Sequence, residues 1–194
     1  NQQYPDALSA YTQATKLDPK QETAWLNKAI ILENQNNLQG AKAAYSNVLN
    51  LNASSADAKD GIARIETQLA NQAATNLQAK LDDAYKAYEA NQFLKASQLA
   101  DAIIQQDAQN ATAYYYKGLA LEGLKKPQLA LTAYQKAVSL APTQTDALYA
   151  LGVLYDTLGQ KKSATDTFQK FVDQTKGQPD DEFIQYAKQR LSQT

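Results

Sequence analysis

This sequence of 194 residues lacks two residue types that carry much of protein chemistry, because it contains no Cys and no His. Disulfides, Ser-His-Asp triads, Cys-His pairs and the common zinc sites all need one of these side chains and are therefore excluded. The seven glycines are scattered, so no glycine-rich loop is available to cradle a phosphate. We expect no catalytic residues, no cofactor and no metal, and we predict that the chain is not an enzyme.

A surplus of positive charge and a long apolar run are also lacking. The formal net charge is -1 at pH 7, which leaves no excess of Lys and Arg to neutralise a phosphate backbone, so nucleic acid is not an expected partner. Apolar runs stay well below the eighteen or so residues of a membrane-spanning helix, so we expect no direct membrane insertion of this segment. A hydrophobic fraction of 44% indicates a folded chain.

Composition leaves the compartment open, because a chain without Cys suits the cytoplasm as well as an oxidising location outside it. Abundant Gln and Asn, Lys in preference to Arg, and the absence of His indicate a bacterial protein. Met is absent even at position 1, and the first residues fall inside a repeat pattern. The sequence is therefore expected to be a piece of a longer protein.

What the sequence does contain is a repeat with an offset of 34 residues, in which Gly118 corresponds to Gly152 and Tyr134 to Phe168. A period in this range is typical of a stacked array of supersecondary elements. Apolar residues return every three or four positions, which predicts helices. We expect each small residue to mark a close approach of two helices, with the aromatic residue filling the space above it.

Turn signals separate the two apolar stretches of each repeat. They are the segments "LKKP" at 124–127 and "LGQKK" at 158–162, and Pro142 follows the second stretch. Because Pro disfavours helix at the residue before it, these positions predict helix ends. Each repeat is therefore predicted to be a helical hairpin.

The pattern resembles the tetratricopeptide repeat. The stretch 111–144 carries the small, large and aromatic positions of that family at Tyr114, Gly118, Leu121, Ala130, Tyr134, Ala137 and Pro142. Stretches 145–178 and 22–55 match it as well, whereas 77–110 is degenerate and the first residues match only the second half of a repeat. The resemblance implies an all-α, right-handed superhelical solenoid of antiparallel helix hairpins.

One interval departs from the period, because Ala29 and Ala84 are separated by one repeat plus about 21 residues. The additional residues predict an extra unpaired helix near the middle. It either continues into the next helix or ends before a new start at Thr75, where Gln78 completes a capping box; we expect the new start. The chain is thus divided into 1–75, with a half repeat, one full repeat and the orphan helix, and 76–194, with three repeats and a C-terminal capping helix over 180–192.

The resemblance also implies a concave groove, lined by fixed positions of the first helix of each repeat. In the first full repeat these positions are Thr23, Leu26, Ile30, Glu33 and Asn34. In the second subarray the expected groove residues are Leu81, Tyr85, Tyr88, Glu89, Tyr115, Leu119, Glu122, Tyr149, Val153 and Asp156. Tyrosines are frequent anchors of recognition surfaces, and the acidic residues add a negative edge. The same tyrosines could instead be half buried for stability alone, and this alternative stays open.

We therefore expect a non-catalytic protein-protein interaction module that acts as a scaffold or adaptor in a multiprotein assembly. Its ligand is expected to be a protein or an extended or helical peptide, with apolar or aromatic anchors flanked by Lys or Arg. Replacing Tyr115 and Tyr149 with Ala is expected to abolish binding and to leave the helical content intact. Two alternatives remain: a structural scaffold that self-associates as a homo-oligomer, and a docking or regulatory segment of a larger enzyme.

Overall fold

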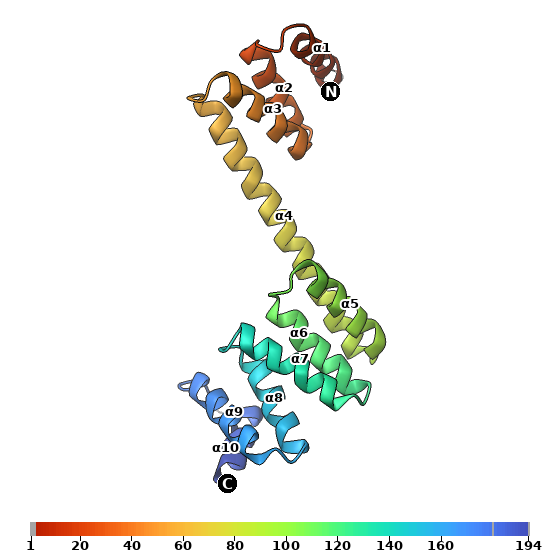
Figure 1. The fold of residues 1–194 in the computed structure, drawn as a ribbon, viewed down its shortest axis with the longest axis vertical. Helices are drawn as coiled ribbons and strands as arrows, with labels where there is room; N and C mark the ends of the chain where they lie inside the picture. Colours follow the sequence, from red (N-terminus) through yellow and green to blue (C-terminus); the bar gives the residue numbers. More distant parts are fainter. Residues whose placement is uncertain (1–2, 180, 194) are drawn as a thin grey trace. The chain divides into compact units, whose positions relative to one another are not determined.

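The computed structural model describes residues 3–179 and 181–193, and every regular element in them is an α-helix, which confirms the predicted all-α fold (Figure 1). The helices are α1 Gln3–Leu17, α2 Glu22–Asn34, α3 Leu38–Leu51, α4 Ala56–Glu89, α5 Phe93–Gln106, α6 Ala111–Gly123, α7 Pro127–Leu140, α8 Thr145–Thr157, α9 Lys161–Gln174 and α10 Glu182–Ser192. They form two compact units, unit 1 and unit 2, divided between Asn76 and Leu77.

Unit 1 contains the hairpin α2–α3, with α1 on one side and the first part of α4 packed into the same core. Tyr45 and Val48 of α3 and Ile65 of α4 are almost completely buried in this core. A Cβ atom at Gly61 of α4 would lie 2.5 Å from the ring of Tyr45. The absence of a side chain at Gly61 therefore lets α4 lie directly on that ring.

Unit 2 begins with the second part of α4, which packs against α5 through buried Ala87 and Ala96. The hairpins α6–α7 and α8–α9 follow, each in contact with its neighbours in the chain. Helix α10 then buries Ile184 and Ala187 against Phe168 of α9. This is the expected C-terminal capping helix; it begins at Glu182, and Asp180, which the sequence placed in it, lies outside the described residues.

The expected new start at Thr75 is wrong, because α4 is one continuous helix. The Thr75 hydroxyl donates a hydrogen bond to the carbonyl oxygen of Asn71 at 2.9 Å, one turn earlier in the same helix. Gln78 donates to Asp82 at 2.7 Å and so does not complete a capping box. Threonine is compatible with a helix interior when its hydroxyl bonds the preceding turn, and this is how Thr75 is accommodated.

The close approach of helices at the small residues is confirmed. A Cβ atom at Gly118 would overlap the ring of Tyr134, and one at Gly152 would lie 2.7 Å from the ring of Phe168. Both rings are almost completely buried. Each glycine therefore provides the space that the aromatic residue of the same hairpin fills, as the repeat pattern predicted.

The turn inside each hairpin contains one residue with a left-handed backbone. These residues are Asn36, Asn91, Lys125 and Gly159, with φ of 57°, 58°, 59° and 72°. Glycine adopts this conformation without steric cost and Asn tolerates it, whereas other residues with a Cβ are strained there. Lys125 is exposed and is the one member of this set that is neither Gly nor Asn.

We predict that Lys125→Gly stabilises unit 2 and that Gly159→Ala destabilises it, each by about 0.5–1 kcal/mol, because the two changes remove and introduce the same backbone strain. Apart from Gly159 and its two chain neighbours, no atom of the described residues lies within 4 Å of the position that a Cβ would occupy there, so packing does not contribute to the second change. Urea unfolding followed by circular dichroism measures both. Shifts of the same sign would contradict the prediction.

A second feature occurs in two of the hairpins: a tyrosine on the second helix donates a hydrogen bond to a glutamate near the end of the first helix. The Tyr45 hydroxyl donates to Glu33 Oε2 at 2.8 Å, and the Tyr134 hydroxyl donates to Glu122 Oε2 at 2.6 Å. Both pairs are separated by 12 residues. Burial, with the hydrogen bond to Glu33, raises the pKa of Tyr45 to about 12, so its phenol stays a neutral donor.

Glu33 also accepts a guanidinium. Arg64 Nε lies 3.1 Å from Glu33 Oε1, and Arg64 Nη2 lies 3.1 Å from Oε2. This two-point pairing matches the planar fork of arginine. The hydrogen bonds from Arg64 hold the pKa of Glu33 below its usual value, against the opposing effect of burial.

We predict that Arg64→Gln lowers the free energy of unfolding of unit 1 by about 0.2–1 kcal/mol at pH 7, since Arg64 is largely exposed and the pair is screened by solvent. Because the pKa of Glu33 is lowered in the folded state, the stabilisation is complete above its ordinary value of 4.5 and is lost as the pH falls through the folded-state pKa. The difference between variant and wild type should therefore shrink in acid.

The only tryptophan, Trp25, packs against the core of unit 1, so its fluorescence reports the unfolding of this unit. Lys42→Gln is the matched control, because the Lys42–Glu66 pair joins α3 to α4 as the Arg64–Glu33 pair joins α2 to α4, and its carboxylate is more exposed than that of Glu33. A loss of stability in Arg64→Gln that does not change with pH would show that packing of the arginine stem, not its charge, stabilises unit 1.

Candidate functional site

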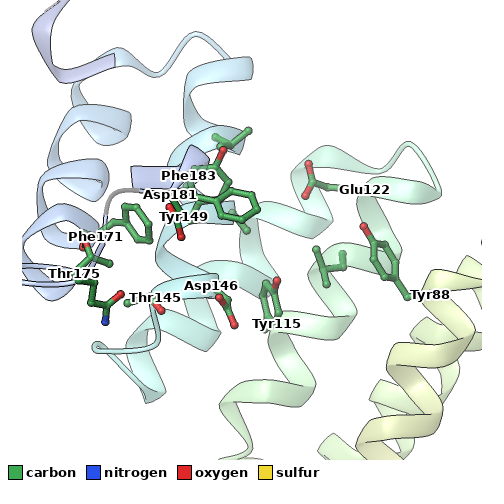
Figure 2. Close-up of a pocket in the computed structure, with 14 residues that line it drawn as sticks. Tyr88, Tyr115, Glu122, Thr145, Asp146, Tyr149, Phe171, Thr175, Asp181 and Phe183 are labelled. Carbon is green, nitrogen blue, oxygen red and sulfur yellow. The ribbon is translucent and has the colours of Figure 1, made fainter. Parts of the chain in front are cut away.

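A groove of about 420 Å³ lies in unit 2, on the side where the first helices of successive hairpins follow one another (Figure 2). Helices α4, α6, α8 and α10 contribute to it, with α9 and the turn before α10. Its lining residues are Tyr88, Tyr115, Leu119, Glu122, Thr145, Asp146, Tyr149, Ala150, Val153, Phe171, Thr175, Gln178, Asp181 and Phe183.

Several residues that the sequence assigned to a groove line this one: Tyr88, Tyr115, Leu119, Glu122, Tyr149 and Val153. The remaining four lie elsewhere. Leu81 is buried in the core beside Ile103 and Ala113, Tyr85 and Glu89 are exposed outside the groove, and Asp156 is paired with Arg190. The structure thus brings together the middle of the assigned set. Whether these residues contact a partner stays a prediction.

Sequence reasoning missed the residues that come from α9, α10 and the turn between them. Phe171, Asp181 and Phe183 are the main examples. The assignment used fixed positions of each repeat, and α10 begins later than a further 34-residue repeat would place it. The available signal was Phe183 itself, an aromatic residue in the first turn of a helix, which is 46% exposed in the structure.

Tyr115 lies between the groove and a row of rings. Its ring centroid is 5.6 Å from that of Tyr116 and 6.0 Å from that of Tyr134. Burial raises the pKa of Tyr115, and the nearby carboxylate of Asp146 adds to this effect. Tyr115 therefore presents a neutral phenol to the groove while its ring is held by other rings.

Tyr149 contacts more rings than Tyr115 does. Its ring centroid lies 4.9 Å from Phe183, 5.4 Å from Phe171, 6.1 Å from Tyr186 and 6.4 Å from Phe168. Aromatic pairs at these distances add to stability beyond the area that they bury. Tyr149 thus lines the groove and also joins α8 to α9 and α10, so Tyr149→Ala removes packing as well as a groove residue and does not isolate binding from stability.

The charges in the groove have one sign. Its lining residues include the carboxylates of Glu122, Asp146 and Asp181 and, among the described residues, no Lys or Arg. Asp181 also caps α10, where it accepts a hydrogen bond from the backbone N–H of Ile184 at 2.8 Å. Burial, followed by Tyr186 and the acidic residues at the start of α10, raises the pKa of Tyr149. The groove therefore combines neutral phenols, apolar rings and negative charge.

Two further classes of site are absent from the described part of the chain. No group of three or more Asp, Glu, His or Cys side chains lies close enough together there to hold a metal ion. None of the helices described is both long and apolar enough to span a membrane.

Curated relatives match limited stretches of much longer proteins. An Arabidopsis thaliana protein described as probable UDP-N-acetylglucosamine–peptide N-acetylglucosaminyltransferase SPINDLY is 31% identical over 80 residues, which is 41% of this chain and 9% of that protein. Tetratricopeptide repeat protein 37 of Xenopus laevis is 30% identical over 100 residues, 50% of this chain and 6% of that protein. A DnaJ homolog subfamily C member 7 homolog of Dictyostelium discoideum is 25% identical over 86% of this chain and 29% of that protein.

Solved structures share the fold at low sequence identity. The double mutant of MamA RS-1 covers 92% of this chain and 88% of its own, with a TM-score of 0.50 and 21% identity. The TPR domain of Arabidopsis OM64 covers 60% and 94%, with a TM-score of 0.54 and 22% identity. The Yersinia enterocolitica type III secretion chaperone SycD, solved with a peptide of the translocator YopD, covers 61% and 92%, with a TM-score of 0.57 and 12% identity.

Family models agree with the hairpins and the repeated glycine-aromatic contacts. Three models described as tetratricopeptide repeat match residues 1–69, 111–144 and 146–174, which together make up more than half of the sequence. The chain belongs to the tetratricopeptide repeat family.

Proposed function

We propose that this chain is a non-catalytic protein-interaction module whose groove in unit 2 binds a peptide segment of another protein. The fold supports an interaction role in general, and the groove supports the specific one. The observation that carries the proposal is the exposed Phe183 ring beside Tyr149, at a hollow that also contains Tyr88 and Tyr115 (Figure 2).

The size and lining of the groove suit a few side chains of a peptide. Its volume of about 420 Å³ lies within the range of small-ligand sites, which is about 300–1,000 Å³. Aromatic side chains that neighbouring rings already hold in place lose little conformational freedom when a partner binds. Tyrosine adds a hydroxyl that can bond a peptide backbone, so the groove offers apolar contact and directed hydrogen bonds together.

The SycD complex supports peptide binding as a use of this fold, because that chaperone was solved with a peptide of its translocator. At 12% identity the likeness extends to the fold alone. The residues that would choose the ligand in this chain are therefore its own groove residues, and the partner is proposed from their chemistry.

Self-association is the competing use of the same surface, in which a second copy of the chain would occupy the groove. Light scattering over a range of protein concentrations separates the two. A constant monomer mass favours a foreign peptide, whereas a mass that rises with concentration and falls on groove substitution favours an oligomeric scaffold.

We predict that Phe183→Ala weakens peptide binding at least tenfold, because it removes an exposed aromatic anchor from the groove. The probe is a fluorescein-labelled peptide selected from a phage-displayed random library on the wild-type chain, with affinity measured by fluorescence anisotropy. Leu94→Ala is the matched control, since Leu94 is 62% exposed on α5 and lies outside the groove.

Thermal unfolding of both variants provides the stability reference, because Phe183 also packs against Tyr149. Failure of the selection to enrich any peptide, or equal affinity of wild type and Phe183→Ala for the selected peptides, would refute peptide binding at this groove.

A further inference from the structure

Three hairpins carry an acidic residue at the same place near the end of their first helix, namely Glu33, Glu122 and Asp156. Two of these carboxylates are paired with arginine within the chain: Arg64 bonds Glu33, and Arg190 bonds Asp156. Glu122 differs from both. In the described part of the chain, the Tyr134 hydroxyl is the only side-chain group bonded to its carboxylate, and no Lys or Arg pairs with it.

The reason for this difference lies in the first helix of the following repeat, which is α4 for Glu33 and α8 for Glu122. Helix α4 begins 34 residues after α2, and α8 begins 34 residues after α6, so the two pairs of helices have the same register. Arg64 follows Glu33 by 31 residues. The same separation from Glu122 reaches Val153, an aliphatic residue that lines the groove. The position that supplies the cation in unit 1 therefore supplies none in unit 2.

The Glu122 carboxylate therefore lines the groove, and within residues 3–179 and 181–193 no cationic side chain is paired with it. The neutral phenol of Tyr134 bonds one of its oxygens but does not cancel the charge. Figure 2 shows Tyr88 and Tyr115 on the same side of the groove as Glu122, with Tyr149, Asp181 and Phe183 on the other. A groove that contains a carboxylate together with aromatic rings is an environment that favours a cation.

We propose that Glu122 receives the guanidinium of an arginine side chain from the bound peptide, in the way that Glu33 receives Arg64 in unit 1. This inference rests on the proposed function, because it names the residue of the peptide that the groove selects. Arginine suits the site better than lysine, since its planar fork bonds a carboxylate at two points, as Arg64 does with Glu33, and stacks on aromatic rings.

The other charged residues of the groove also favour a positively charged ligand. Asp146 and Asp181 add negative charge to the lining, which contains no described basic residue. A basic segment with one apolar or aromatic anchor complements this surface: the anchor contacts Phe183 and Tyr149, and the arginine reaches Glu122. The same charges disfavour an acidic segment, so the groove discriminates by repulsion as well as by attraction.

The test is a double-mutant cycle on the peptides selected from the random library. Replacing the peptide arginine by citrulline, which keeps the shape and removes the charge, should weaken binding to the wild-type chain roughly tenfold to a hundredfold, as expected for a charged hydrogen bond. Glu122→Gln should cause a similar loss of affinity for the arginine peptide. The variant should then bind the arginine and citrulline peptides with equal affinity. The amide oxygen of the variant can still accept from Tyr134, so the hairpin is kept.

Asp166→Asn is the matched control, because Asp166 is exposed on α9 outside the groove and the substitution changes the net charge equally. This variant should bind the arginine peptide and the citrulline peptide with the same affinities as the wild-type chain. If the arginine and citrulline peptides bind equally well to the wild-type chain while Phe183→Ala still weakens both, the arginine site is refuted and peptide binding stands. If Phe183→Ala has no effect either, both proposals fail.

A second variant tests the site from within. Val153→Arg places a cation at the position that corresponds to Arg64 in unit 1. The new arginine should pair with Glu122 and compete with the peptide arginine, so the variant should bind the selected peptide at least tenfold more weakly. Val153→Gln, which adds polar bulk without charge, is the control and should weaken binding less. Melting temperatures identify a variant that does not fold, in which case the Glu122→Gln cycle decides. Equal affinity of folded Val153→Arg and wild type would overturn the inference.

Discussion

The structure of this chain depends on one steric constraint, which is the contact between a small residue on the first helix of a hairpin and an aromatic ring on the second. At Gly118 the ring of Tyr134 occupies the space of a missing Cβ, and Phe168 does the same at Gly152. The ring fixes how closely two helices approach, and the next hairpin packs on the surface that results. The tyrosine version also carries a hydroxyl to Glu122, so one residue sets both the packing and the position of a carboxylate.

Most of the fold follows from the sequence, because steric requirements recur at a fixed period. The glycine-aromatic pairs predict the hairpins, and the turn segments predict the break between α6 and α7 and the break between α8 and α9. The continuity of α4 was not predictable in the same way. A Ser or Thr followed three residues later by Gln is compatible with a helix start and with a helix interior. The outcome depends on whether the hydroxyl of Thr75 bonds a backbone group later in the chain or, as here, the carbonyl oxygen of the preceding turn.

The site was predictable in its middle and not at its edges. Tyr115, Tyr149 and Glu122 occupy fixed positions of a repeat, so a pattern locates them. Leu81 occupies an equivalent position but is buried in the core, since the neighbouring side chains differ between hairpins. Burial depends on contacts between hairpins, which a periodic sequence does not specify, and the pairing of a carboxylate with arginine depends on such contacts too.

The contribution of α10 to the groove has a consequence for the peptide binding that we propose. Phe183 lies in a helix that starts out of step with the repeat period, and Asp181 caps that helix, whereas the opposite wall consists of residues that occupy fixed repeat positions. Substitutions on the exposed side of α10 leave the glycine-aromatic contacts untouched. Under the proposed function, ligand preference can therefore diverge between related chains at this helix while the architecture of the hairpins is kept.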